Sequence, residues 1–246
     1  MFLAYLVAGI IGSSNAILWG VYGDLLVEKF EGIKVARSLV IGGFVAIYLY
    51  LLNPNLPIFI VTLLVIAFER SLTEIYKALL RREDQSKYQI PSDLNFKLNY
   101  GIKFVLGVLL IAFLLATFFV IDFSADNLWL ALVGGVIVAI GGAVKDAPYE
   151  GFDKLKFWRS PVVGVAFGIF LFTFFKDLPS KYFLIAVPGG ERIISESYKK
   201  IVKGKIPGKF KSSLKRNKKW LERRKNILYL YGLNVASIVL LFLIAI

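Results

Sequence analysis

The stretch that decides the fold is Gly142–Gly164, GAVKDAPYEGFDKLKFWRSPVVG, which joins the end of one apolar run to the start of the next through a charged connector. The chain contains this stretch twice, because Gly20–Gly42 reads GVYGDLLVEKFEGIKVARSLVIG. The copies align without a gap at an offset of 122 residues, as from Asp24 to Asp146. The residues that recur are Gly20, Asp24, Glu28, Phe30, Lys34, Arg37, Ser38, Val40 and Gly42, as Gly142, Asp146, Glu150, Phe152, Lys156, Arg159, Ser160, Val162 and Gly164.

The same offset continues downstream, where Thr73 becomes Ser195. Glu69, Arg70, Glu74, Tyr76 and Lys77 recur as Glu191, Arg192, Glu196, Tyr198 and Lys199. A fixed offset over this length indicates a tandem duplication. We expect one integral membrane domain made of two repeats, residues 1–122 and 123–246. The polar residues match better than the apolar ones around them, which favours a functional motif over a packing scaffold alone.

The composition predicts a polytopic membrane protein of the all-α class. Of the 246 residues, 57% are hydrophobic, and they occur in long runs. The net charge of +13 indicates cytoplasmic loops and anionic lipid headgroups rather than nucleic acid. The chain has no Cys and no His, which excludes thiol nucleophiles, imidazole bases and the usual zinc sites. Hard metals with oxygen ligands, such as Mg²⁺, remain.

The apolar runs predict a helical bundle of eight transmembrane spans, arranged as two parallel four-helix repeats. We interpret the apolar N-terminus as the first span rather than a signal peptide, because it has no basic segment before it. The predicted spans are 1–23, 39–52, 57–76, 98–121, 128–144, 161–175, 182–198 and 226–246.

The charges predict the orientation. Nearly all Lys and Arg residues fall in four loops, 24–37, 77–97, 145–159 and 199–225, which share one face of an eight-span bundle. We expect the protein to lie in the cell (inner) membrane. The positive-inside rule then places this face on the cytoplasmic side and both termini on the outer side. Each repeat has an even number of spans, so both copies have the same orientation.

The repeated connector carries an acidic pair and two basic residues. Asp24 and Glu28, like Asp146 and Glu150, are four residues apart and share one face if the helix continues through them. At the C-terminal end of a span the helix dipole disfavours anions, so these carboxylates need a cation. That cation is either a divalent metal or the basic side chains of the connector, Lys34, Arg37, Lys156 and Arg159. Carboxylates, a hard metal and basic residues suit a pyrophosphate ester, whereas ion pairs alone would simply close each loop.

A second constellation lies near the cytoplasmic ends of the third and seventh predicted spans. Glu69-Arg70 with Glu74 recurs as Glu191-Arg192 with Glu196. Ionisable residues at membrane depth usually face the bundle interior or a polar cavity. They either pair with one another or line the cytoplasmic cavity. Pro188-Gly189-Gly190 interrupts the second copy alone, as a kink or as a close approach of backbone to ligand.

With these motifs placed, the chain resembles the UbiA-type intramembrane prenyltransferases, which are built from parallel four-helix repeats. Gly20-x3-Asp24-x3-Glu28, then Lys34 and Arg37, is similar to the first acidic motif of that family. Asp146-x3-Glu150, then Arg159, Ser160 and Pro161, is similar to the second, with Glu28, Glu150 and Gly20 departing from it in residue type. The resemblance implies that Asp24, Glu28, Asp146 and Glu150 are catalytic ligands of Mg²⁺. It also implies diphosphate contacts from the basic residues, including Lys77, Arg81 and Arg82.

The leading hypothesis is therefore a Mg²⁺-dependent enzyme that moves an isoprenoid group from a prenyl diphosphate to a lipophilic acceptor in the membrane. Another phosphate-lipid enzyme is a second hypothesis, although the chain has no Gly-rich phosphate loop. A transporter or channel that uses Glu69, Arg70, Glu191 and Arg192 is a third. The sequence names neither the acceptor nor the length of the prenyl chain.

Overall fold

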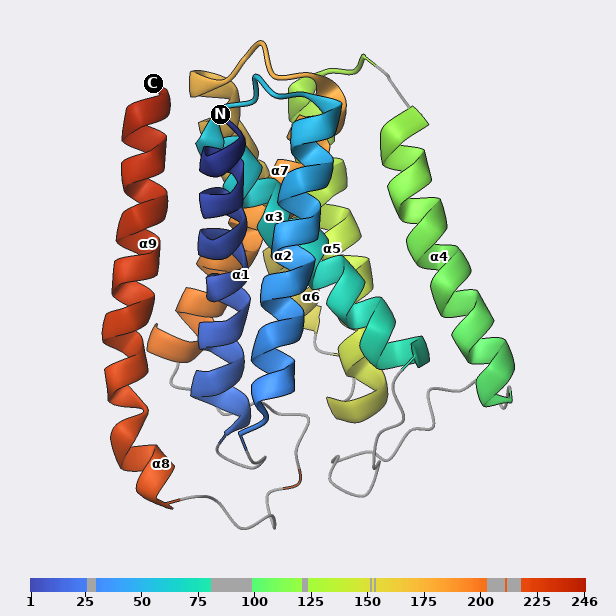
Figure 1. The fold of residues 1–246 in the computed structure, drawn as a ribbon, viewed down its shortest axis with the longest axis vertical. Coiled ribbons are helices and arrows are strands. Elements are labelled where there is room, and N and C mark those ends of the chain that lie inside the picture. Colours follow the sequence, from blue (N-terminus) through green and yellow to red (C-terminus); the bar gives the residue numbers. More distant parts are fainter. Residues whose placement is uncertain are drawn as a thin grey trace. The chain divides into compact units, whose positions relative to one another are not determined.

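The computed structural model describes residues 1–25, 30–80, 99–120, 124–150, 152, 154–202, 211 and 218–246. Every regular element in these ranges is a helix (Figure 1), which confirms the all-α prediction. The elements are α1 (Phe2–Asp24), α2 (Gly32–Leu52), α3 (Ile58–Ile75), η1 (Tyr76–Leu80), α4 (Tyr100–Val120), α5 (Asn127–Glu150), α6 (Lys154–Phe174), α7 (Ser180–Ser197), η3 (Tyr198–Val202), α8 (Lys218–Arg223) and α9 (Lys225–Ala245).

Four helical segments in the described ranges are long and apolar enough to cross a membrane. They are Phe2–Gly23, Gly32–Leu52, Phe157–Phe174 and Lys219–Ala245, and shorter apolar stretches lie in α4 and α5. This agrees with an integral membrane protein. Helices α3 and α7 are different, because ionisable residues occupy their C-terminal halves. In α3 the apolar half is also buried, from Phe59 to Phe68.

The charged connectors are more helical than the sequence indicated. Helix α2 begins at Gly32 rather than at residue 39, and α6 begins at Lys154 rather than at Pro161. Helix α5 continues to Glu150. The charges end the apolar pattern without ending the backbone hydrogen bonding, so hydropathy alone placed these boundaries too far inside the apolar runs.

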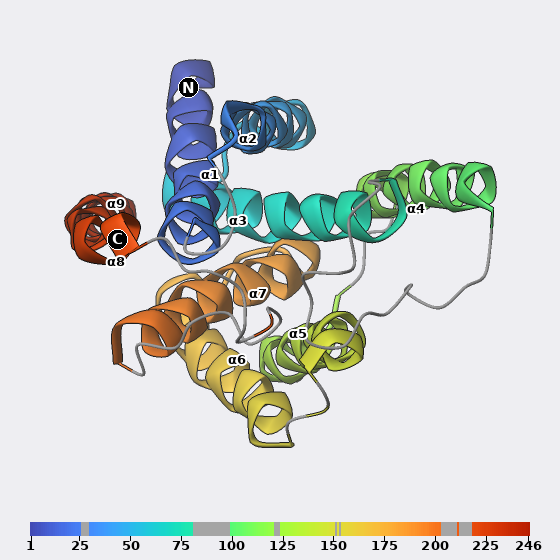
Figure 2. The same cartoon turned by 90° about the horizontal axis from the view of Figure 1, so that it is seen from below.

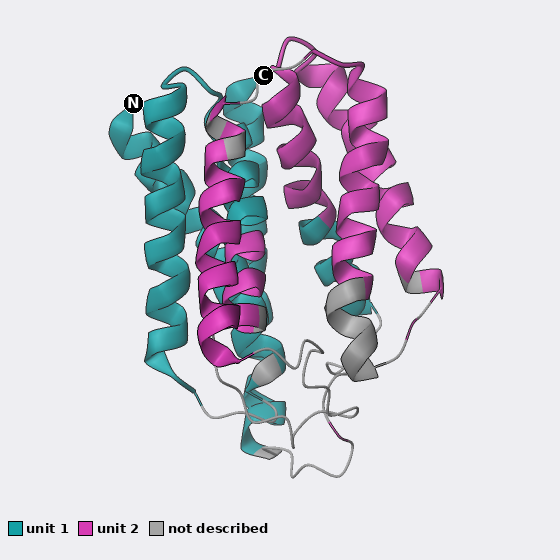
Figure 3. Ribbon diagram, turned by 90° about the vertical axis from the view of Figure 1, so that its right-hand side faces the viewer, with its two compact units in different colours: residues 1–69, 192–207, 213–246 teal, residues 70–191, 208–212 magenta. Residues whose placement is uncertain are grey.

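The chain divides into two compact units (Figure 3). Unit 1 contains residues 1–69, 192–207 and 213–246, and unit 2 contains residues 70–191 and 208–212. Unit 1 therefore combines α1, α2 and most of α3 from the first repeat with α9 from the second, and unit 2 combines α4 from the first repeat with α5, α6 and most of α7 from the second. Both divisions fall directly after the repeated glutamate, Glu69 in α3 and Glu191 in α7.

The same small-residue helix crossing occurs in each unit. In unit 1, where α1 and α2 lie side by side (Figure 2), a Cβ atom added to Gly42 would overlap the Ser13 side chain and lie 2.7 Å from the Gly9 carbonyl oxygen. In unit 2, a Cβ atom on Gly164 would lie 2.6 Å from the Cα atom of Gly135. Gly164 and Gly135 follow Gly42 and Ser13 by the repeat offset. Small residues let the two backbones approach closely, so the sequence repeat corresponds to a repeated packing arrangement.

The Pro188-Gly189-Gly190 sequence does not end α7, which continues as a helix to Ser197. The Phe167 ring of α6 lies where a Cβ atom of Gly190 would be, and the Cδ atom of Pro188 lies 3.3 Å from a Cβ atom built on Gly134 of α5. The glycine therefore admits a neighbouring aromatic ring. The close approach at Gly190 comes from this protein side chain, whereas the predicted alternatives of a kink or an approach to a ligand stay predictions.

A π-helical turn follows both copies of the second constellation. The first is η1, Tyr76–Leu80, and the second is η3, Tyr198–Val202. These ranges are related residue for residue by the repeat offset. Because π turns are rare and concentrate at functional sites, their recurrence marks this position as more than an ordinary helix end.

Candidate functional site

The acidic pair of the second copy lies on a continuous helix. Asp146 and Glu150 both belong to the last two turns of α5, so their Cα atoms lie one turn apart on the same face. This meets the condition on which the predicted pairing depended. The side chains of Asp146 and Glu150 are outside the described residues, as is that of Lys156 in α6.

The acidic pair of the first copy is described in part. Asp24 is the last residue of α1, and its side chain is not among those described. Glu28 lies outside the described ranges. Beyond it, the Nζ atom of Lys34 is 3.1 Å from the Oε1 atom of Glu31 in the first turn of α2. Lys34 is therefore engaged in a local, largely solvated ion pair, which contributes little to stability.

The two arginines that follow the acidic pairs take equivalent positions in their helices. Arg37 is the sixth residue of α2, and Arg159 is the sixth residue of α6. The Nε atom of Arg159 is buried and has no hydrogen-bond partner in the part of the chain that the structure describes. A buried donor without an acceptor costs about 1–3 kcal/mol. Arg159 therefore offers an open, charged donor shortly after the acidic end of α5.

A buried hydrogen bond links the basic connector to the second constellation in unit 1. The Oγ atom of Ser38 donates to the Oε1 atom of Glu69 at 2.8 Å, and both side chains are buried. Their repeat counterparts in unit 2, Ser160 and Glu191, are buried as well. The sequence analysis noted that serine and glutamate both recur but did not predict that they meet. Their joint recurrence at one offset is the signal that could have revealed the contact.

Other charges of the second constellation form local ion pairs with residues three or four positions away. The Nη1 atom of Arg70 in α3 lies 2.6 Å from Glu74 Oε1, and the Nζ atom of Lys77 in η1 lies 3.5 Å from the same oxygen. In the second copy, Lys199 Nζ lies 3.2 Å from Glu196 Oε1. Lys77, predicted as a diphosphate contact, thus has a carboxylate neighbour. Arg81 and Arg82 lie outside the described ranges.

The donor set suits a hard cation. Among the side chains that the structure describes, no group of three or more carboxylates is placed to hold a metal ion. The four predicted ligands, Asp24, Glu28, Asp146 and Glu150, are not among those side chains. Their oxygen atoms are the ligand type that Mg²⁺ prefers, and Arg159 is the type of donor that phosphate oxygens accept from. The Mg²⁺-diphosphate site therefore stays a prediction from residue type.

The comparisons with known proteins gave no relative. No protein-family model matches the chain, and neither the curated proteins nor the solved structures yielded a match. The functional argument accordingly depends on the residues themselves.

Proposed function

We propose that this chain is an integral membrane prenyltransferase that moves an isoprenoid group from a prenyl diphosphate to a lipophilic acceptor with the help of Mg²⁺. The observation that carries the proposal is the buried, open Nε donor of Arg159, nine residues beyond the helical acidic pair that ends at Glu150. An acidic pair on one helix face followed by an open cationic donor is an arrangement that binds a metal and an anion together.

The proposed membrane arrangement follows from the charges. We infer eight spans in two parallel repeats, residues 1–122 and 123–246, with the basic connectors on the cytoplasmic side of the cell membrane. Four of these spans are supported by helical segments of sufficient length and apolar character among the described residues, and the segregation of Lys and Arg supports the orientation.

Each residue of the two motifs has a proposed role. Asp24, Glu28, Asp146 and Glu150 hold Mg²⁺ through their carboxylate oxygens. Arg37 and Arg159 contact the diphosphate, with Lys34, Lys156, Lys77, Arg81 and Arg82 contributing positive charge around it. When bound, Mg²⁺ neutralises the diphosphate oxygens and so stabilises the charge that develops as the isoprenoid group departs.

Thermal unfolding in detergent, with and without Mg²⁺ plus geranylgeranyl diphosphate, tests the proposal. The wild type is expected to gain melting temperature from the ligands by mass action. Asp146→Asn and Arg159→Gln should each abolish that gain. Neither should lower the melting temperature without ligand, because the first removes a repelling charge and the second removes an unpaired buried donor.

The matched control is Asp126, a carboxylate that caps the start of α5 and is not part of the acidic motifs. The Oδ1 atom of Asp126 accepts hydrogen bonds from the backbone N–H groups of Leu128 (2.7 Å) and Trp129 (3.4 Å) at the start of α5. Asp126→Ala, which removes the acceptor of both hydrogen bonds, should lower the melting temperature in every condition yet keep the ligand-dependent gain. If the wild type shows no gain, and the Asp146 and Arg159 variants unfold early in every condition, then the motif is structural and the proposal is wrong.

The burial of Glu69 favours a second candidate, ion translocation. A carboxylate that is 2% exposed at membrane depth is a feature of transporters as well as of enzymes. Flux through proteoliposomes that Glu69→Gln abolishes, together with no ligand-dependent gain in melting temperature, would favour the transporter.

A further inference from the structure

Asn15 lies in the middle of α1 and is fully buried. Its Nδ2 atom donates to the Oδ1 atom of Asn234 in α9 at 3.2 Å, and the Nδ2 atom of Asn234 donates to the carbonyl oxygen of Ile11 at 2.8 Å. The Oδ1 atom of Asn15 is buried and has no hydrogen-bond partner within the described ranges. One acceptor of this amide pair is thus left open in the interior of unit 1.

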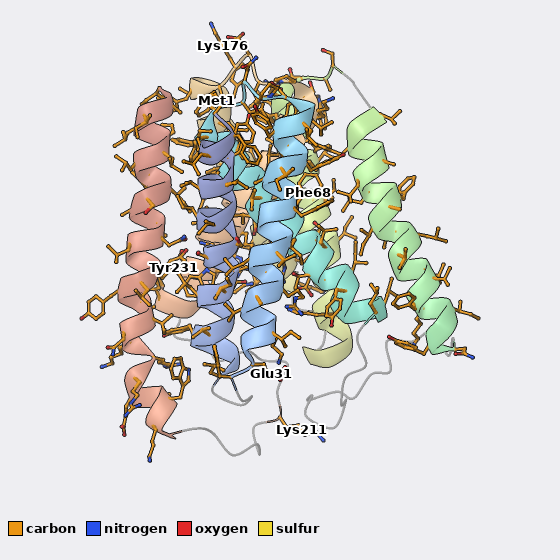
Figure 4. All side chains as sticks on the ribbon, viewed as in Figure 1. Met1, Glu31, Phe68, Lys176, Lys211 and Tyr231 are labelled. Atoms are coloured by element: carbon orange, nitrogen blue, oxygen red, sulfur yellow. The ribbon has the colours of Figure 1, made fainter. Side chains whose placement is uncertain are left out.

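Aromatic rings and hydroxyl groups lie next to this amide pair. The rings of Trp19 and Tyr231 have centroids 4.0 Å apart, and Tyr22 packs on the Trp19 ring edge-to-face at 6.0 Å. The hydroxyl group of Tyr231, labelled in Figure 4, is 2.7 Å from the Oγ atom of Ser197. We call the set of Asn15, Trp19, Tyr22, Ser197, Tyr231 and Asn234 the Asn15 cluster. All of its members belong to unit 1.

The repeated scaffold does not require the Asn15 cluster. Asn15, Trp19 and Tyr22 follow an i, i+4, i+7 spacing, which places them on one face of α1. The corresponding positions of the second copy, at the repeat offset, are Ile137, Gly141 and Val144. Since α5 forms the equivalent helix with apolar and small residues at these positions, the polar and aromatic side chains serve a task specific to unit 1.

The open acceptor indicates what that task is. An unsatisfied polar atom in the interior of a membrane protein is costly, because no water is there to supply the missing donor. A purely structural Asn15–Asn234 pair would fix the register of α1 and α9 but would leave this oxygen without a donor. A bound molecule that contributes a donor satisfies it.

We propose that the Asn15 cluster binds the hydroxyl group of a long-chain lipid alcohol, which donates a hydrogen bond to the Oδ1 atom of Asn15. The half-buried residues Leu18, Ile227, Leu228 and Val235 pack against the cluster and form an apolar layer for the chain of that lipid. The donor is a neutral hydroxyl rather than an ammonium group. A second positive charge is disfavoured here, because Arg224 already lies 5.0 Å from the centre of the Tyr22 ring.

Fluorescence of Trp19 tests this site directly. Trp129→Phe, Trp158→Phe and Trp220→Phe together leave Trp19 as the only tryptophan of the chain. In detergent, without Mg²⁺ or diphosphate, geranylgeraniol should change the Trp19 emission in a saturable way. The corresponding hydrocarbon without the hydroxyl group should act at least tenfold more weakly. No saturable change, or an equal response to both compounds, overturns the proposal.

Two further variants separate binding from folding. Asn15→Leu should weaken the response to the alcohol at least tenfold and leave the response to the hydrocarbon unchanged. Ser237→Ala is the control, because the Oγ atom of Ser237 donates to the Leu233 carbonyl oxygen on the exposed side of α9. This variant should respond to the alcohol like the parent. If Asn15→Leu binds the alcohol like the parent, Asn15 is structural and the proposal is wrong.

The comparison of alcohol and hydrocarbon on the parent needs no Asn15 variant, so it decides the question even if Asn15→Leu does not fold. Since no diphosphate is present, failure here is distinct from failure of the proposed prenyltransferase activity.

Discussion

At the scale of single residues, the buried hydrogen bond from Ser38 to Glu69 can be tested by a single substitution. Removing the hydroxyl group leaves a buried carboxylate oxygen with one donor fewer, which costs about 1–3 kcal/mol. We therefore expect Ser38→Ala to lower the free energy of unfolding by that amount, measured by denaturant unfolding in detergent. Ser237→Ala, on the exposed side of α9, should change it by less than about 0.5 kcal/mol. Equal effects of the two variants would contradict the assignment.

The sequence predicted which residues matter more reliably than what they touch. The recurrence of Ser38, Glu69 and Arg70 singled them out, but their partners depend on which face of α2 meets α3. That depends on helix rotation, which the all-round apolar pattern of α2 leaves open. The predicted metal ligands Asp24, Glu28, Asp146 and Glu150 stay predictions, except that a helix does continue through Asp146 and Glu150.

At the scale of helices, the large and the small side chain of one packing contact change places between the two copies. The second copy places Phe167 against Gly190, whereas the corresponding residues in the first copy are Val45 and Phe68, both buried. Gly190→Ala should therefore destabilise the protein by about 1–3 kcal/mol through overpacking, although alanine is the better helix former. Gly141→Ala in α5, with nothing within 4 Å of its added Cβ atom, should be neutral or stabilising by up to about 1 kcal/mol. Denaturant unfolding measures both, and a stabilised Gly190→Ala would show that the Phe167 ring is free to move.

Helix boundaries were the least predictable elements. The acidic and basic residues of the connectors have no apolar periodicity, so the sequence placed the start of α2 and of α6 seven residues late. Pro161 illustrates the physical reason. Proline at the edge of an apolar run usually begins a helix, yet here it lies inside α6, where its Cα atom would be 2.8 Å from a Cβ atom on Gly135. This close packing of α6 on α5 is a tertiary contact, which helix propensity does not report.

At the scale of the whole molecule, four cysteine substitutions test the parallel repeat. Phe30 and Asn55 flank α2, and Phe152 and Asp177 flank α6 at the repeat offset; all four side chains are exposed. Each helix has 21 residues, about 32 Å, enough to cross the hydrocarbon core. In cells, a membrane-impermeant thiol reagent should label cysteine at 55 and 177 but not at 30 and 152. The natural chain, which lacks cysteine, provides the blank. Labelling of 55 and 152 from the same side would mean inverted repeats.

The π turns at Tyr76–Leu80 and Tyr198–Val202 also bear on the order in which features of the two copies arose. A π turn arises when one residue is inserted into an α-helix, and the same insertion at matching positions is simplest if it happened once. Under the predicted tandem duplication, the insertion is then older than the duplication. Two features differ between the copies: the contact of Phe167 with Gly190, and the Asn15 cluster. Both differences then arose after the duplication. Under the predicted duplication, the single copy already carried the glutamate, the arginine and the π turn, whereas the Asn15 cluster and the contact of Phe167 with Gly190 each belong to one copy.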